Sequence, residues 1–138
     1  VAASAVLTVD LRNTDELALR RAEQRLADEL AALARDEGVE ITSRPLARFE
    51  PVRFDARVVD LVERTAQGFG FSTRRMPSGA GHDAQMLARV CPTAMIFVPS
   101  IRGLSHNPAE RTDPADLEAG ANVLLHTMLA LAEEGALP

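Results

Sequence analysis

The sequence predicts an α/β fold, in which β-strands and α-helices alternate along the chain. Segment 5–12 alternates apolar and polar residues, as a half-buried strand does. Segment 93–98 is a continuous apolar run, which is typical of a strand covered on both faces. Two longer stretches repeat apolar residues every three or four positions, as amphipathic helices do. The patterns divide the 138-residue chain near residue 55, and we expect one domain or two small subdomains.

The first part of the chain has the order strand, helix, strand. After the first strand, Thr14 is the expected N-cap of a helix with acidic residues in its first turn. Gly38 is the expected C-terminal end of that helix. Segment 39–50 is a candidate for the second strand, which Pro45 either breaks or places at an edge because proline has no N–H. A β-α-β piece this small cannot bury both faces of its sheet, so we expect it to join a larger sheet or an interface. The expected apolar stripe of the helix holds Leu19, Ala22, Leu26, Leu30 and Leu33.

The second part has the order helix, loop, short helix, strand, loop, helix. Asp55 is the expected N-cap of its first helix, and the turn-forming residues of 68–81 make the following loop. The short helix is expected at about 83–89. Asp113 is the expected cap of the last helix, with Pro114 at its first position. The expected buried stripe of the last helix holds Leu117, Ala121, Leu124, Met128 and Leu131.

The composition disfavours nucleic acid and membranes as partners. The net charge is −5, and a nucleic-acid partner needs a basic face. No apolar run approaches the length of a membrane span, and "VAASAVLTVD" lacks the basic region and long apolar core of a signal peptide. Cys91 is the single cysteine and cannot form an internal disulfide, so we expect a reducing, cytoplasmic location. Because Cys91 borders the apolar run, we expect it to be a buried thiol.

Two loops carry the residues that are expected to do chemistry. His106 follows the strand predicted at 93–98, and ligands of open α/β sheets bind at the carboxyl ends of strands. His82 follows Gly79 and Gly81, which allow a sharp turn and a close approach to a ligand. The His82 imidazole is suited either to donate to an oxyanion or to bind a metal ion. An ordinary turn or surface position is the competing interpretation for both histidines.

Residue spacing alone does not complete a metal site. The sequence has no HExxH, CxxC or HxH motif, and two loop histidines do not supply the three or four ligands that zinc needs. Asp83 is expected either to cap the helix that follows or to orient an imidazole. Glu110 is expected to be a solvated acid or a helix-start residue, and Arg12 an exposed charge or an ion-pair partner. The residues alone therefore predict an α/β piece with a candidate polar site near His82 and His106.

Two motifs resemble a known family. "SGAGHDAQ" (78–85) and "MIFVPSIRGLSHNPAERT" (95–112) closely resemble the C-terminal part of the M20-type amidohydrolases of the hydantoinase/carbamoylase group. That group includes N-carbamoyl-L-amino acid hydrolases, allantoate amidohydrolases and β-ureidopropionases. "LTVDLR" (7–12) resembles the Asp-x-Arg strand of the family's lid. The resemblance implies that 1–54 belongs to the lid, or dimerisation, domain and that 55–138 is the C-terminal part of the zinc-hydrolase catalytic domain.

The resemblance also implies roles for individual residues. His106 matches the last ligand of a two-metal site, which would hold Zn or alternatively Mn, Co or Ni. His82 matches a histidine that contacts the substrate and its tetrahedral intermediate, with Gly81 beside it. Arg12 matches the arginine that grips the substrate carboxylate, and lid residues act in the partner subunit's site, which implies a homodimer. The implied reaction is attack of a metal-activated water on the ureido carbon of an N-carbamoyl-L-amino acid or allantoate.

The chain departs from the family pattern in length. The family's other metal ligands and its catalytic glutamate lie N-terminal to anything in this sequence. We therefore expect a C-terminal fragment that is inactive alone and poorly soluble or oligomeric. The alternative is a non-catalytic α/β dimerisation or binding module, which would fold alone without metal dependence. "SHNPAERT" (105–112) leans slightly towards the allantoate-type enzymes.

Overall fold

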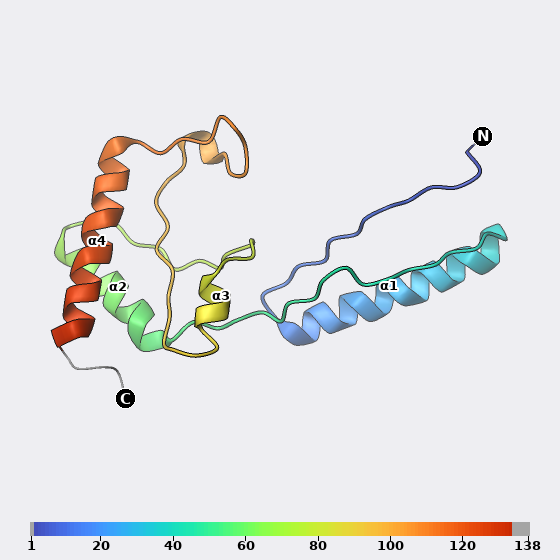
Figure 1. Cartoon of the computed structure of the whole chain (residues 1–138), viewed down its shortest axis with the longest axis horizontal. Coiled ribbons are helices and arrows are strands. Elements are labelled where there is room, and N and C mark those ends of the chain that lie inside the picture. The colour runs from blue at the N-terminus through green and yellow to red at the C-terminus, as the bar shows by residue number, and fades with distance from the viewer. Residues whose placement is uncertain (1, 134–138) are drawn as a thin grey trace. The chain divides into compact units, whose positions relative to one another are not determined.

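The computed structural model describes residues 2–133, and within this range every assigned element is a helix (Figure 1). In chain order the elements are α1 (Glu16–Glu37), α2 (Ala56–Gly68), α3 (Ala84–Leu87), the 3-10 helix η1 (Ile101–Gly103) and α4 (Pro114–Glu133). The chain divides into two compact units, Val1–Val52 with Pro77–Ala80 and Arg53–Met76 with Gly81–Pro138. The assignment of lid and catalytic domains to the two parts of the chain stays a prediction.

The ends of α1 follow from local capping. Asp15, not the predicted Thr14, is the N-cap, and its carboxylate accepts a hydrogen bond of 2.7 Å from the backbone N–H of Ala18. A carboxylate accepts this bond and also interacts favourably with the positive end of the helix dipole. Gly38 ends the helix in the left-handed conformation, with φ 64° and ψ 34°. The predicted C-terminal end is therefore confirmed, and the predicted N-cap was wrong by one residue.

Ion pairs join α1 to the segment that follows it. Arg48 Nη2 lies 2.7 Å from Glu16 Oε1, and Arg48 Nε lies 2.9 Å from Glu23 Oε1. The hydrogen bond from Arg48 is the main reason that the pKa of Glu16 lies below its ordinary value. Apolar burial contributes little here, because Leu19 is buried but Leu33, from the same predicted stripe, is 48% exposed.

The three predicted strands, 5–12, 39–50 and 93–98, are not assigned as strands within residues 2–133. Figure 1 draws the first two as extended traces without a helical turn. A strand requires a neighbour that pairs with its backbone N–H and C=O groups. Within residues 2–133, segments 5–12 and 39–50 have no such neighbouring strand, and segment 93–98 makes one isolated bond of this kind, from Asp55 N–H to the Thr93 carbonyl at 3.1 Å. The exposure of the first segment agrees with this, since Val6 is 96% exposed.

In the second unit, α2 and α4 pack against each other. Asp55 caps α2, as predicted, and accepts hydrogen bonds from the backbone N–H groups of Arg57 and Val58. The ring of Phe69, just after α2, meets the imidazole of His126 on α4 edge-on, with 5.0 Å between centroids. The buried residues of this unit are Val58, Ala84, Val123 and Thr127.

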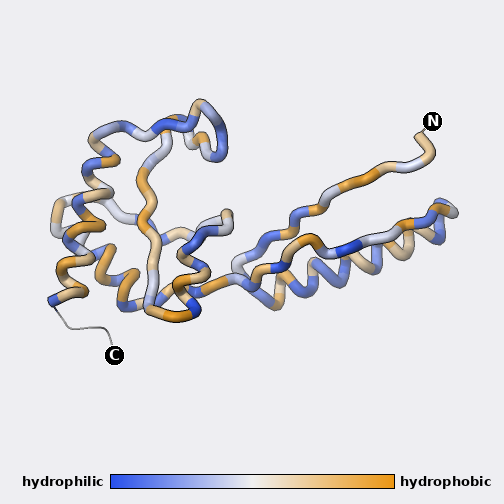
Figure 2. The backbone as a smooth tube through the Cα atoms, viewed as in Figure 1, coloured by the Kyte–Doolittle hydropathy of each residue, from blue (hydrophilic) through white to orange (hydrophobic). Residues whose placement is uncertain are grey.

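Helix α4 begins at Pro114, as predicted, and the Asp113 carboxylate accepts a hydrogen bond from Ala115 N–H. The predicted buried stripe was wrong, because Leu124 is 51% exposed while Val123 is 4% exposed. One residue along a helix is a rotation of about 100°. The face of α4 that packs on α2 therefore lies beside the face that was predicted to be buried. Figure 2 shows apolar residues on much of α4, which explains why periodicity did not identify the buried side.

The chain leaves much of its apolar surface exposed. Its accessible surface is 11243 Å² for a mass of 14.9 kDa. A folded monomer of that mass exposes about 7,000 Å², and two separate folded bodies of the same total mass expose about 8,400 Å². Among the described residues the buried hydrophobic core holds four side chains, in a sequence that is 46% hydrophobic. Among the helices within residues 2–133, none is long and apolar enough to cross a bilayer.

Candidate functional site

His82 lies at the start of α3, where its side chain makes the capping hydrogen bond that was expected from Asp83. Its Nδ1 accepts a hydrogen bond of 3.1 Å from the backbone N–H of Ala84. Its own backbone N–H donates to Gln85 Oε1 at 3.3 Å. Asp83 occupies the N-cap position but makes no side-chain capping bond, so the expectation that it caps this helix was wrong. A neutral imidazole whose Nδ1 accepts carries its hydrogen on Nε2, so the ring presents an N–H donor on its far side.

The glycines before His82, which were expected to allow a sharp turn, do not adopt a left-handed backbone. Neither Gly79 nor Gly81 is among the residues with positive φ. A Cβ added to Gly81 would lie 3.6 Å from Gln85 Oε1, which is an ordinary contact. Neither the backbone conformation nor the space around it therefore requires glycine at position 81.

His106 lies in a loop with an unusual backbone. Its φ is 54°, in the left-handed region that residues with side chains rarely adopt. Its backbone N–H donates to Glu110 Oε2 at 2.8 Å. The loop is closed at its ends by a hydrogen bond of 2.7 Å from Ile101 N–H to the Arg111 carbonyl. His106 is thus held in one backbone conformation, although it is exposed.

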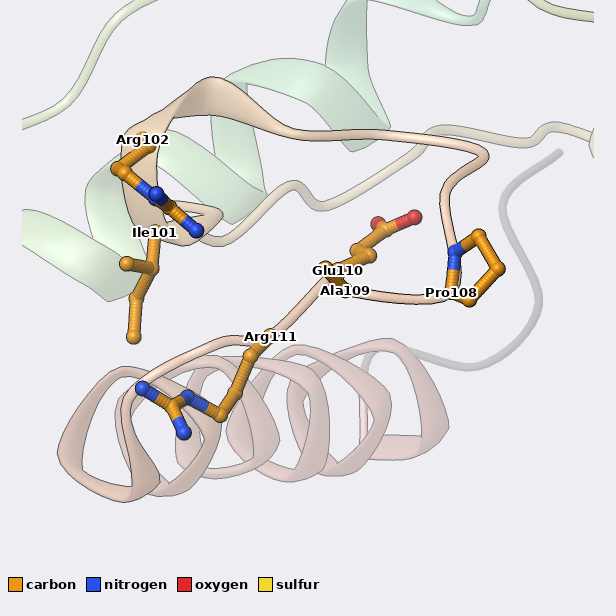
Figure 3. A pocket seen from close by; sticks show the side chains of 6 residues that line it. All are labelled: Ile101, Arg102, Pro108, Ala109, Glu110 and Arg111. Atoms are coloured by element: carbon orange, nitrogen blue, oxygen red, sulfur yellow. The ribbon is translucent and has the colours of Figure 1, made fainter.

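A polar hollow of about 340 Å³ lies along this loop (Figure 3). Its wall includes two arginines, Arg102 and Arg111, and the carboxylate of Glu110. A second hollow of about 200 Å³ adjoins the start of α2, and Cys91 is part of its wall. Cys91 is exposed, so the expectation of a buried thiol was wrong.

Arg12 lies in the first unit, where Asp10 orients its guanidinium. Arg12 Nε donates to Asp10 Oδ1 at 3.0 Å, and Nη2 donates to Oδ2 at 2.7 Å. Arg12 Nη1 donates to the carbonyl of Gly79, in the same unit, at 2.6 Å. The hydrogen bond from Arg12 is the main reason that the pKa of Asp10 lies below its ordinary value. Each guanidinium nitrogen uses one N–H, so two of the five donors remain for a bound carboxylate.

The described residues show His82, His106 and Arg12 each within its own set of local contacts. His82 and His106 belong to the second unit and bond within their own loops, while Arg12 belongs to the first. Within residues 2–133, no group of three or more His, Cys, Asp or Glu side chains could hold a metal ion. The residues that the structure describes therefore do not fit a complete metal centre, and His106 is a candidate for one of its ligands.

Two contacts of these side chains were missed at the level of sequence, whereas the ion pair of Arg12 with Asp10 agrees with the expectation that Arg12 is an exposed charge or an ion-pair partner. Glu110 was interpreted as a solvated acid, although it accepts a hydrogen bond from His106. Its position four residues after His106, with Pro108 between them, is a turn signal that could have indicated the contact. The contacts of Gln85 with His82 and of Asp10 with Arg12 also span short sequence separations.

Known proteins share both the sequence and the backbone of this chain. A sequence profile of Peptidase family M20/M25/M40 matches residues 5–130. An N-carbamoyl-L-amino-acid amidohydrolase from Rhizobium meliloti is 40% identical over 128 residues, which are 93% of this chain and 31% of that protein. An allantoate amidohydrolase from Escherichia coli is 39% identical over 125 residues, which are 91% of this chain and 30% of that protein.

A solved structure of a related protein also matches this chain. The crystal structure of a hydantoinase/carbamoylase family amidase from Burkholderia vietnamiensis matches with a TM-score of 0.78 and 45% identity, over 85% of this chain and 28% of the other. The chain therefore spans about 30% of the length of the curated relatives it matches. These findings confirm the resemblance predicted from the two loop motifs.

Proposed function

Since the chain belongs to Peptidase family M20/M25/M40, we propose that it is the C-terminal part of a metal-dependent amidohydrolase. The proposed reaction is hydrolysis of the carbamoyl (ureido) C–N bond of an N-carbamoyl-L-amino acid or of allantoate. For an N-carbamoyl amino acid, water adds to the ureido carbon and the products are the amino acid, carbon dioxide and ammonia. Relatives named for both substrates match more than nine-tenths of this chain.

The observation that carries the proposal is the hydrogen bond between His82 Nδ1 and the backbone N–H of Ala84. This bond leaves the proton of the neutral ring on Nε2, so Nε2 is the nitrogen that can donate to a substrate. Attack on a ureido carbon develops negative charge on its oxygen, and a fixed N–H donor stabilises that charge more in the transition state than in the substrate. His82 would therefore act as an oxyanion donor, with Gly81 beside it leaving room for the substrate.

Arg12 would bind the carboxylate that these substrates carry. Its guanidinium is held by Asp10 and retains two N–H donors. An arginine held in one orientation loses less freedom when it binds a carboxylate, so the scissile group is positioned with greater precision. Removal of Arg12 should thus weaken substrate binding, whereas removal of His82 should slow the chemical step.

His106 would supply one ligand of the metal centre. The other ligands would come from parts of the family's catalytic domain that this chain does not contain. A bound divalent ion, zinc or alternatively Mn, Co or Ni, would supply Lewis acidity and an activated water. A homodimer and a cytoplasmic location belong to the same proposal.

The test is a chimera with the Rhizobium relative, in which this chain replaces the 128 residues that it matches. Ammonia release is measured with N-carbamoyl-L-amino acids and with allantoate. We expect hydrolysis of one of them, a fall in kcat of about 100-fold for His82→Ala, and a raised KM for Arg12→Met. Arg21→Met, on the exposed surface of α1, is the matched control and should leave both constants unchanged.

The alternative function is a non-catalytic α/β dimerisation or binding module. A folded chimera that neither binds metal nor hydrolyses any of these substrates would favour that alternative. Hydrolysis that is insensitive to both His82→Ala and Arg12→Met would contradict the assigned roles.

A further inference from the structure

The loop that carries His106 concentrates unusual backbone conformations. Arg102, Gly103 and His106 have φ values of 60°, 66° and 54°. A left-handed conformation is disfavoured for residues with a Cβ, so other contacts must hold Arg102 and His106 in it. The hydrogen bond from Ile101 to Arg111 closes the loop ends but does not fix its tip.

Glu110 is the side chain that contacts the tip. Its Oε2 accepts the backbone N–H of His106 at 2.8 Å, within the normal range for a charge-assisted bond. The backbone N–H of Glu110 donates to the carbonyl of Asn107 at 2.8 Å. Asn107 Oδ1 in turn accepts the backbone N–H of Ala109 at 2.9 Å. The carboxylate is thus tied to the turn on which His106 lies.

We propose that Glu110 is a positioning residue that fixes the direction of the His106 imidazole by holding the His106 backbone in its left-handed conformation. The direction of a Cα–Cβ bond depends on the backbone dihedrals, so a change of φ at His106 would redirect its ring. Glu110 would act only through His106. The consequence for metal binding rests on the proposed function, in which His106 is a metal ligand.

Two substitutions separate the hydrogen bond from the charge. Glu110→Ala removes the acceptor, whereas Glu110→Gln keeps an oxygen of similar reach without the negative charge. Glu118→Ala, an exposed acid on α4, is the matched control for loss of a carboxylate. A merely electrostatic role would make the Gln and Ala variants equivalent, while a positioning role predicts rescue by Gln.

The first readout is the exchange rate of the His106 backbone amide with water, measured by NMR on this chain. We expect Glu110→Ala to speed exchange about tenfold, the size that loss of an exposed hydrogen bond to a charged acceptor implies. Glu110→Gln should change it less than Glu110→Ala, and Glu118→Ala should leave it unchanged. A folded Glu110→Ala variant with unchanged exchange at His106 would overturn the proposal.

The second readout is zinc affinity in the chimera, which is expected to fall about 10- to 100-fold for Glu110→Ala, as for other residues that orient metal ligands. Recovery of most of this affinity in Glu110→Gln supports the proposal. Unchanged zinc affinity in Glu110→Ala overturns it and leaves the proposed function intact. If the unsubstituted chimera binds no zinc, the proposed function fails, and the amide exchange of His106 alone decides whether Glu110 holds the loop.

Discussion

The packing of segment 93–98 on α4 can be tested at Gly120. A Cβ added to Gly120 would lie 2.4 Å from Val98 Cγ1. Carbon atoms in contact lie about 3.5–4.0 Å apart, so the substitution Gly120→Ala requires a shift of more than ~1 Å. The side chain of Val98 has one rotatable bond, which leaves it little freedom to avoid the added methyl group.

Two opposing effects determine how much Gly120→Ala changes the free energy of unfolding. Alanine is favoured over glycine in a helix interior by about 1 kcal/mol. An added methyl group in a packed contact costs about 1–3 kcal/mol. We therefore expect Gly120→Ala to lower the free energy of unfolding by about 1 kcal/mol. In the presence of Val98→Ala the clash is removed, so the same substitution should become stabilising.

The assay is urea unfolding followed by circular dichroism at 222 nm, because the chain has no Trp or Tyr for fluorescence. Gly68→Ala is the matched control, since a Cβ on this other helical glycine meets nothing within 4 Å. It should not destabilise the protein. The reasoning is refuted if Gly120→Ala stabilises the otherwise unsubstituted protein as much as it stabilises the Val98→Ala variant.

Further predictions concern the caps and the two faces of α4. The pKa of Asp55 is lowered from 3.8 to about 2, mainly by the hydrogen bond from the Arg57 side chain. The stabilisation that ionised Asp55 gives the folded chain is therefore complete above pH ~4 and is lost as pH falls through 2. The difference in melting temperature between wild type and Asp55→Asn should therefore shrink between pH 5 and pH 2. Gly38→Ala should cost about 1 kcal/mol in urea unfolding, because φ is 64° there; an unchanged midpoint would contradict this. Val123→Ala should cost about 2 kcal/mol, whereas Leu124→Gln, on the exposed face, should reduce self-association in analytical ultracentrifugation without lowering stability. A fall in stability for Leu124→Gln would place that face in the core.

Local signals predicted the helices well. The cap at Asp55, the C-terminal glycine at Gly38 and the first-turn proline of α4 each act within a few residues, so a single sequence is sufficient to locate them. The family resemblance rested on two loop motifs and was confirmed over most of the chain.

Non-local interactions explain the predictions that were wrong. Segment 93–98 has a strand pattern, but a strand also needs a continuous pairing partner, and within the described residues only Asp55 N–H bonds to it, at the Thr93 carbonyl. On α4 the apolar residues occur on several faces, so periodicity gave no unique buried side. The contact of Glu110 with His106 was missed because the turn signal around Pro108 places the two residues near each other but does not specify which group Glu110 bonds to.

The most direct test of the account is the number of metal ions per chain, counted by native mass spectrometry on the isolated chain, the chimera and the His106→Ala chimera. We expect none on the isolated chain, two on the chimera and fewer than two after His106→Ala. Two ions retained by the His106→Ala chimera would contradict the claim that this chain contributes a metal ligand. So would stoichiometric metal on the isolated chain, because a complete site would then exist within it.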